Sequence, residues 1–293
     1  RVLFRSMKLT FLGTGAGETY PGYWCECPHC TYARKHRGKN LRTNSSMVID
    51  EELLIDIGPS CFDNAARFGV NLSKLKTLLV THPHEDHLYP QHLHWRNTDE
   101  SLLPLTYVEK MRHGGPRFTD IPQLNIYGNS FVMETLRKSL DDMEELKINL
   151  HEIREGKEEK TDGYRILPVR GNHGSQRGFS HSYIIQKDGK TLLYALDSGS
   201  YDEDQFALIQ EHQYDAVIME GTTGLNEQYG GHMCLMNNIR IRDRLKENKC
   251  LRENSRFLLT HLSPHWCPPH DWYESIVASE GLELAYDGLQ IEV

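Results

Sequence analysis

Short apolar segments alternate with turn-forming residues along most of the chain, and this pattern predicts a strand-rich protein. Residues 46–57 alternate apolar and polar positions around an acidic turn, which is typical of a β-hairpin. Residues 59–70 instead place apolar side chains at helical spacing. Further strands are predicted at residues 8–12, 75–80, 124–127, 148–153, 164–169, 182–186, 191–196, 216–219, 256–259 and 283–286.

Further helices are predicted at residues 130–143, 204–212, 234–248 and 271–279. Strands in hairpin-like runs, interrupted by amphipathic helices, predict an α/β (α+β) fold in which two sheets pack together with helices outside. No linker or short-period repeat divides the chain, so a single domain is expected over residues 7–293. Residues 98–122 are rich in Gly, Pro and charge and form an expected insertion. Met7 is the expected natural start, with residues 1–6 as upstream additions.

The bulk composition excludes several classes of protein. The net charge of −8, without a block of like charges, argues against a basic face that grips nucleic acid. The apolar runs are far shorter than the ~20 residues that cross a bilayer, so no membrane span is expected. Seven cysteines without a visible export signal indicate a cytoplasmic protein with metal ligands rather than a disulfide framework.

The densest cluster of metal-binding side chains directly follows the predicted strand at 75–80. It reads His82-Pro83-His84-Glu85-Asp86-His87. Two histidines at i and i+2 can bind one ion, and Asp86 with His87 can serve a second. Imidazole together with carboxylate suits Zn, Mn or Fe better than Ca. A histidine-rich surface loop is the alternative, but three histidines and an aspartate within six residues favour a metal site.

Three later residues also end predicted strands, namely His173, Asp197 and His261. Each alone could be an ordinary polar group at a strand end. Taken with the first cluster, they predict a dinuclear centre at one edge of the sheets.

A second metal site is predicted at Cys25, Cys27 and Cys30, which form a C-x-C-x-x-C element in the loop after the first strand. Tetrahedral zinc needs a fourth ligand. His265 is the candidate, because it lies four residues after His261 and one loop would then carry both sites. Cys267 is its competitor. Such a closed site would contribute folding free energy rather than chemistry, and free cysteines without a metal are the alternative.

The dinuclear candidates together resemble the metallo-β-lactamase superfamily, over nearly the whole chain from Met7. The resemblance implies an αββα sandwich of two packed mixed sheets with helices outside. It also implies one metal on His82, His84 and His173, the other on Asp86, His87 and His261, and Asp197 as the bridge.

The cysteine element narrows the resemblance to two branches of this superfamily. They are the phosphoribosyl 1,2-cyclic phosphate phosphodiesterases of the carbon–phosphorus lyase pathway and a protein of pyrroloquinoline quinone biosynthesis. The second lacks an intact H-x-H-x-D-H run, so this chain is more similar to the first. It departs from that branch by one added residue between His261 and His265 and by a longer segment at 98–122.

The resemblance implies a phosphodiesterase with two divalent metals (Zn or Mn) in the active site and one structural Zn. A hydroxide held between the two metals would attack a small cyclic phosphodiester such as a phosphoribosyl cyclic phosphate. Asp86 would hold a metal and orient the nucleophile. His232, where the phosphodiesterases have a histidine beside the substrate, would be a general acid or a phosphate-binding donor. An ordinary histidine at a helix start is the alternative.

The same metal-binding residues would also suit three other kinds of protein: an RNA-processing nuclease, a lactone or thioester hydrolase, and a non-catalytic carrier of the quinone-biosynthesis type. A homodimer is compatible with the sequence. Residues 13–17 are predicted to be a tight turn without a role in binding. No role is assigned to six further residues, namely His92, His94, His113, Trp95, Trp266 and Trp272.

Overall fold

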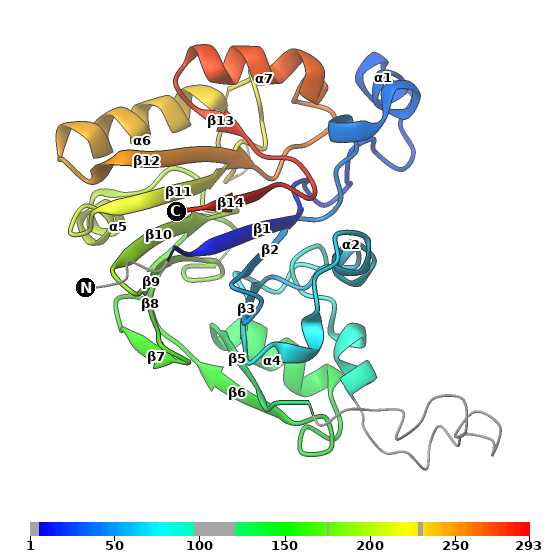
Figure 1. Ribbon diagram of the computed structural model, residues 1–293, viewed down its shortest axis with the longest axis vertical. Helices are drawn as coiled ribbons and strands as arrows, with labels where there is room; N and C mark the ends of the chain where they lie inside the picture. The colour runs from blue at the N-terminus through cyan, green and yellow to red at the C-terminus, as the bar shows by residue number, and fades with distance from the viewer. Residues whose placement is uncertain (1–5, 97–120, 175, 228–230) are drawn as a thin grey trace.

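Two seven-stranded sheets form the centre of the protein in the computed structural model, which describes residues 6–96, 121–174, 176–227 and 231–293 (Figure 1). The first sheet has the order β14-β1-β2-β3-β4-β5-β6. Its strands are β1 (Lys8–Gly13), β2 (Ser46–Ile49), β3 (Leu53–Ile55), β4 (Thr77–Leu79), β5 (Leu124–Gly128), β6 (Ile148–Glu152) and β14 (Gln290–Glu292).

The second sheet has the order β13-β12-β11-β10-β9-β8-β7. Its strands are β7 (Glu159–Thr161), β8 (Tyr164–Arg170), β9 (His181–Lys187), β10 (Lys190–Ala195), β11 (Tyr214–Glu220), β12 (Leu251–Thr260) and β13 (Glu283–Leu284). Each sheet has an antiparallel half and a parallel half. Pairing is antiparallel from β14 to β3 and from β7 to β10, and parallel from β3 to β6 and from β10 to β13.

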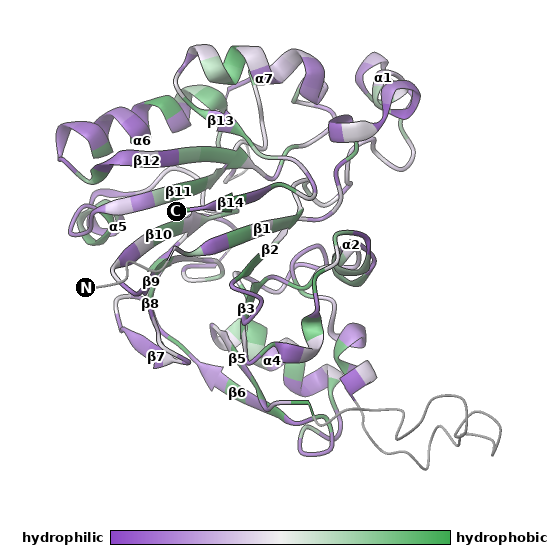
Figure 2. Cartoon of the chain, viewed as in Figure 1, coloured by the Kyte–Doolittle hydropathy of each residue, from purple (hydrophilic) through white to green (hydrophobic). Residues whose placement is uncertain are grey.

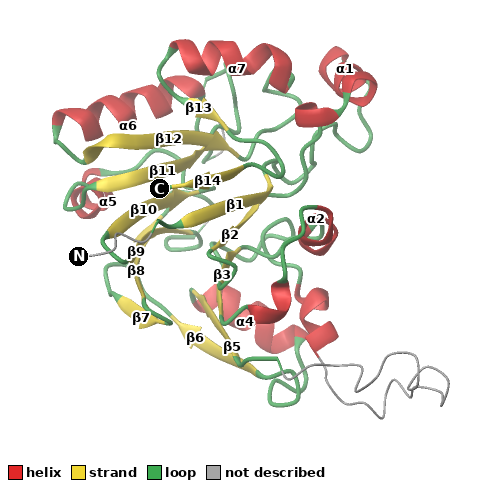
Figure 3. Cartoon of the chain, in the orientation of Figure 1, coloured by secondary structure: helices red, strands yellow, loops and turns green. Residues whose placement is uncertain are grey.

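Helices lie on the outer faces of the two sheets (Figure 3). Cores of buried residues join α2 and α4 to the first sheet and α5, α6 and α7 to the second. The helices are α1 (Pro28–His36), α2 (Cys61–Arg67), α4 (Ser130–Ser139), α5 (Glu203–Ile209), α6 (Leu235–Glu247) and α7 (His270–Ser279), with 3-10 turns η1 (Gly38–Asn40), η2 (Leu72–Lys74) and η3 (Pro90–Arg96).

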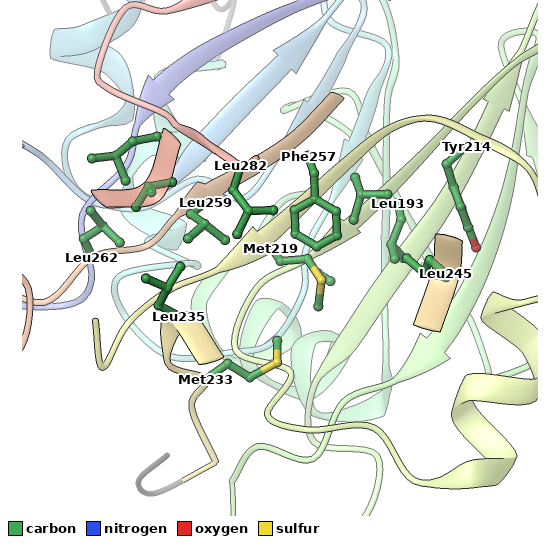
Figure 4. Close-up of a cluster of buried hydrophobic side chains, with 14 of the residues drawn as sticks. Leu193, Tyr214, Met219, Met233, Leu235, Leu245, Phe257, Leu259, Leu262 and Leu282 are labelled. Atoms are coloured by element: carbon green, nitrogen blue, oxygen red, sulfur yellow. The ribbon is translucent and has the colours of Figure 1, made fainter. Parts of the chain in front are cut away.

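Successive side chains of a strand point to opposite faces of its sheet. Each central strand therefore packs against the other sheet with one face and against the helices with the other. On β10, Leu192 and Tyr194 pack between the sheets, whereas Leu193 and Ala195 pack against the helices. Figure 4 shows Leu193 near Leu245 of α6. Burial on both faces makes long stretches of the central strands continuously apolar, and Figure 2 shows these stretches in green.

The predicted αββα sandwich is confirmed. The prediction that the whole cysteine element lies in a loop is wrong for Cys30, which lies on α1. Pro28 occupies the first helical position, where the missing N–H is not needed. The edge strands β7 and β14 were not predicted, because Glu159–Thr161 and Gln290–Glu292 carry few apolar side chains.

Most of the predicted insertion, and His113 with it, lies outside the described residues. The single domain over 7–293 stays a prediction. Within the described ranges, no helix combines the length and apolar character that crossing a bilayer requires.

Candidate metal centre

The predicted ligands of the dinuclear centre lie just after the ends of four strands. The loop containing residues 82–87 follows β4, His173 follows β8, Asp197 follows β10 and His261 follows β12. The structure brings all seven residues together at one edge of the sandwich, where the ends of strands from both sheets meet; this edge is called the rim below.

The first group contains His82, His84 and His173. His82 Nε2 lies 2.9 Å from His84 Nδ1, and His173 Nε2 lies 3.3 Å from the same atom. Three imidazoles therefore point their nitrogens at one small volume.

The second group contains Asp86, His87, Asp197 and His261. His87 Nε2 lies 3.3 Å from Asp86 Oδ2 and 3.2 Å from His261 Nε2. Asp197 Oδ2 lies 2.8 Å from His87 Nε2 and also 3.3 Å from His82 Nε2 of the first group. Asp197 thus connects the two groups.

These spacings fit divalent metal ions. Nitrogen or oxygen ligands about 2.0–2.1 Å from a tetrahedral ion lie about 3.3 Å from one another. Burial lowers the pKa of His82 well below its usual value, which keeps the imidazole neutral and able to bind a metal. Burial also lowers the pKa of His173.

The carboxylates around His87 provide a second indication. Burial alone would lower the pKa of His87, but Asp86, Asp56 and Asp197 together raise it well above its usual value. Three carboxylates around one buried ring are an excess of negative charge, which a divalent ion would neutralise. Imidazole combined with carboxylate suits Zn or Mn better than Ca.

Asp56, which sequence analysis missed, supports His87 from behind. His87 Nδ1 donates to Asp56 Oδ2 at 2.7 Å, and the Thr81 backbone N–H donates to Asp56 Oδ1 at 2.8 Å. A carboxylate on the far nitrogen fixes the ring and its tautomer, which directs Nε2 to the metal side. The available signal was its position directly after the apolar strand β3.

Glu220 is a second missed residue, at the end of β11. His261 Nδ1 donates to Thr222 Oγ1 at 2.9 Å, and the Thr222 hydroxyl donates to Glu220 Oε2 at 2.6 Å. The backbone N–H groups of Ser198 and Gly199 donate to Glu220 Oε1. Glu220 is fully buried, and these hydrogen bonds position Thr222 behind His261 and the backbone that follows Asp197.

His232 lies against this carboxylate. Its Nδ1 is 3.0 Å from Glu220 Oε2 and 3.1 Å from Asp197 Oδ1. Burial lowers the pKa of His232, but the two carboxylates outweigh burial and raise it to about 11. His232 therefore lies beside the proposed ligands, next to two carboxylates that favour the protonated form of its ring, and its role stays a prediction.

Three residues of the site have left-handed backbones. The φ angles are 61° at Asp56, 45° at Asp197 and 57° at His261. Such conformations cost about 1–3 kcal/mol each for residues other than glycine, and they concentrate at functional sites. At each strand end the chain turns sharply, which directs the side chain to the rim.

A cavity of about 420 Å³ opens over this rim. Its lining residues are Ala16, Gly17, Glu18, His84, Asp86, His173, Asp197, Thr222, Thr223, His232, His261, Ser263, His265 and Trp266. Residues 13–17 were expected to be a plain turn, but the structure places Ala16 and Gly17 in this lining. A Cβ on Gly17 would lie 3.4 Å from Asp86 Oδ2, in ordinary van der Waals contact, so this residue lies beside a proposed ligand. Trp266, to which no role was assigned in the sequence analysis, also lines the cavity.

The cysteine cluster forms a separate group. The sulfurs of Cys25, Cys27 and Cys30 lie within 4.8 Å of one another, and His265 Nδ1 lies 3.8 Å from Cys25 Sγ. Cys267 is fully buried, with its Sγ 3.4 Å from the carbonyl oxygens of residues 221 and 222. His265 is therefore better placed than Cys267 to be the fourth ligand.

The other singled-out residues do not face the metal groups. His92 Nε2 contacts the Pro59 carbonyl, and His94 Nε2 contacts the Ser139 carbonyl. Trp95 and Trp272 are exposed at the surface.

Comparison with known proteins places these features in a family. A model described as "Beta-lactamase superfamily domain" matches residues 51–262. Ribonuclease Z of Listeria innocua is 27% identical over an alignment of 195 residues that covers 64% of this chain and 52% of that protein, so the chain spans about half the length of this relative. Coenzyme PQQ synthesis protein B of Acinetobacter baumannii is 22% identical over 98% of this chain and 100% of that protein.

Two solved structures share the fold. A diphosphatase from the PhnP family has a TM-score of 0.73 at 21% identity, over 99% of this chain and 98% of that one. Zinc-bound PqqB from Methylobacterium extorquens has a TM-score of 0.71 at 17% identity, over 98% of this chain and 100% of that one. The strand order, the donor groups at the rim and the matching family model identify this chain as a member of the metallo-β-lactamase superfamily.

Proposed function

We propose that this protein is a two-metal phosphodiesterase that hydrolyses a small cyclic phosphodiester, such as a phosphoribosyl cyclic phosphate. The observation that carries the proposal is the pair of donor groups that Asp197 connects beneath one cavity, with His232 on the cavity wall. The substrate would lie between the two groups and His232.

When bound, two divalent ions would lower the pKa of water to near 7 and stabilise negative charge on the phosphoryl oxygens. Asp86 lines the cavity and can accept a hydrogen bond from the attacking water, which orients it toward phosphorus. The proposed ligands are His82, His84 and His173 for one ion and Asp86, His87 and His261 for the other, with Asp197 shared.

His232 would donate a proton to the departing sugar oxygen, because an alkoxide is a poor leaving group until it is protonated. Glu220 holds the ring by Nδ1, which leaves Nε2 as the nitrogen for the substrate. The thiolate group with His265 would hold a structural zinc that stabilises the loop at the cavity mouth.

Processing of RNA is the second candidate function, and the sequence match to ribonuclease Z favours it. The net charge of −8 favours a small substrate instead, because RNA binding draws its affinity from cationic side chains. A cavity of about 420 Å³ also lies in the range of sites for small ligands. A non-catalytic carrier is the third candidate, favoured by the full-length match to PQQ synthesis protein B.

The deciding experiment combines a substrate panel with metal counting. The panel contains a ribose cyclic phosphate, cyclic nucleotides, bis-p-nitrophenyl phosphate and a precursor tRNA. The proposal expects about three metal ions per chain and turnover of the cyclic phosphates. Cleavage of the tRNA alone would support the nuclease. About one metal ion in the histidine site and no turnover of any substrate would support the carrier.

A further inference from the structure

Glu18 stands on the cavity wall between the two predicted metal sites. Its Oε2 contacts Nε2 of His265, and both residues line the cavity together with Asp86. The other nitrogen of His265 lies 3.8 Å from Cys25 Sγ. One imidazole therefore connects the thiolate group to a carboxylate that faces the substrate cavity.

The backbone around Glu18 is fixed on both sides. A Cβ on Gly17 would lie 3.4 Å from Asp86 Oδ2, and the Asn44 side-chain amide donates to the Gly17 carbonyl at 3.2 Å. Thr19 has a φ of 63°, and its N–H donates to the Ala16 carbonyl at 2.9 Å. This turn places Glu18 next to the proposed dinuclear centre without making it a member of either donor group there.

A carboxylate in this position is suited to one kind of ligand group. It would repel the anionic phosphoryl group, so it does not bind that part of the substrate. It has several acceptor positions on two oxygens, and the N–H of His265 occupies one of them. The Glu18 side chain is 58% exposed at the mouth, so it can accept a further hydrogen bond from a hydroxyl group.

We infer that Glu18, held by His265, binds a hydroxyl group on the alcohol part of the substrate and thereby selects phosphodiesters of sugar-like alcohols. This inference rests on the proposed function, because it places the alcohol part opposite the dinuclear centre in the same cavity. The thiolate site would then also influence substrate specificity, because His265, its proposed fourth ligand, positions Glu18 in the substrate cavity.

The test compares Glu18→Ala and Glu18→Gln with the wild-type protein. The control is Glu26→Ala, which removes an exposed carboxylate of the same loop that does not line the cavity. The substrates are a ribose cyclic phosphate and bis-p-nitrophenyl phosphate, which has no hydroxyl group. Binding of ribose 5-phosphate is measured by calorimetry, and metal content is counted for every variant.

Glu18→Ala is expected to lower the ratio of kcat/KM for the ribose substrate over the aryl substrate by roughly 10- to 100-fold, the contribution of a hydrogen bond to a charged group. Glu18→Gln keeps an acceptor oxygen and should restore most of this ratio. Glu26→Ala should retain the wild-type ratio. Ribose phosphate binding should weaken in Glu18→Ala while the metal count stays at the wild-type value.

An unchanged ratio in Glu18→Ala would overturn the inference, and so would a loss of metal from the thiolate site that accounts for the effect. The proposed function fails separately, if the wild-type protein hydrolyses neither phosphodiester. In that case calorimetry still decides, because ribose phosphate binding that depends on Glu18 supports the inference, and binding that is absent or independent of Glu18 overturns it.

Discussion

His232 Nδ1 and Glu220 Oε2 lie 3.0 Å apart, and this contact makes the carboxylate the group that fixes the imidazole in the cavity wall. The Glu220 carboxylate receives hydrogen bonds from the backbone N–H groups of Ser198 and Gly199, the Thr222 hydroxyl and His232. Its position is therefore set by the fold, and the position of His232 follows from it.

If His232 protonates the leaving oxygen, His232→Ala should affect substrates according to their leaving group. An alkyl phosphodiester should lose about 10²–10⁴-fold in kcat. A p-nitrophenyl ester should lose much less, because p-nitrophenolate departs without a proton. Steady-state kinetics on both substrates provides the measurement, and equal losses would refute the role as an acid. Glu220→Gln should show the same dependence on the leaving group, with a smaller loss.

Asp86→Ala should abolish turnover while the fold is retained. The variant removes a carboxylate 3.3 Å from His87 Nε2 and 3.6 Å from His261 Nε2, so the second donor group loses one of its members. We expect metal analysis to find about one ion fewer per chain and kcat to fall at least about 10³-fold. Circular dichroism serves as the control for folding. Parental hydrolysis of a cyclic phosphate by this variant would contradict the assignment.

Cys27→Ser should remove the structural metal without direct damage to the dinuclear centre. The expected result is one ion fewer per chain and a Tm lower by about 5–10 °C, since the loop loses its cross-link. Cys234→Ser is the matched control, because Cys234 lies outside the thiolate group and serine is a good residue for its position before α6. An unchanged metal count in Cys27→Ser would show that the thiolates bind no metal.

Stability should rise with pH between about 4 and 6.5 because of His270. This buried ring accepts a hydrogen bond at Nδ1 from the permanently charged Arg42 at 2.8 Å, while Glu274 lies 3.4 Å from Nε2. Burial, together with Arg42, lowers the pKa of His270 to about 4. The unfolded chain binds a proton below about pH 6.5 and the folded protein does not, so acid favours unfolding.

Urea unfolding at several pH values measures this effect. Each unit of pKa shift corresponds to about 1.4 kcal/mol, so the contribution of His270 should approach roughly 3 kcal/mol over this range. The same measurement on His270→Gln should give a shallower dependence on pH. Identical slopes for the two proteins would exclude His270 as the source.

The proposed ligands could be selected from the sequence because they follow four apolar strands, either directly or, for residues 82–87, in the loop after the strand. Asp56 and Glu220 end strands in the same way, yet both were missed. Asp56 was included in the predicted hairpin at 46–57, and the predicted strand at 216–219 stopped one residue before Glu220. Their partners, His87 and His232, lie 31 and 12 residues away, and only the packed structure shows these contacts.

The cavity wall was harder to predict for a different reason. Residues 13–17 have the composition of a turn, and only the packed structure shows that Ala16 and Gly17 line the same cavity as Asp86. Helix α1 was missed because cysteine spacing suggested only a loop, although Pro28 is a normal start signal for a helix.

The proposed ligands are divided between the two sheets, since residues 82–87 follow a strand of the first and the other three follow strands of the second. Bound ions would therefore cross-link the halves of the sandwich. The affinity of the protein for metal and the affinity of one sheet for the other must then strengthen each other by thermodynamic linkage. A chelator would accordingly weaken the packing of the two sheets against each other. Neither sheet expressed alone could provide the complete set of ligands.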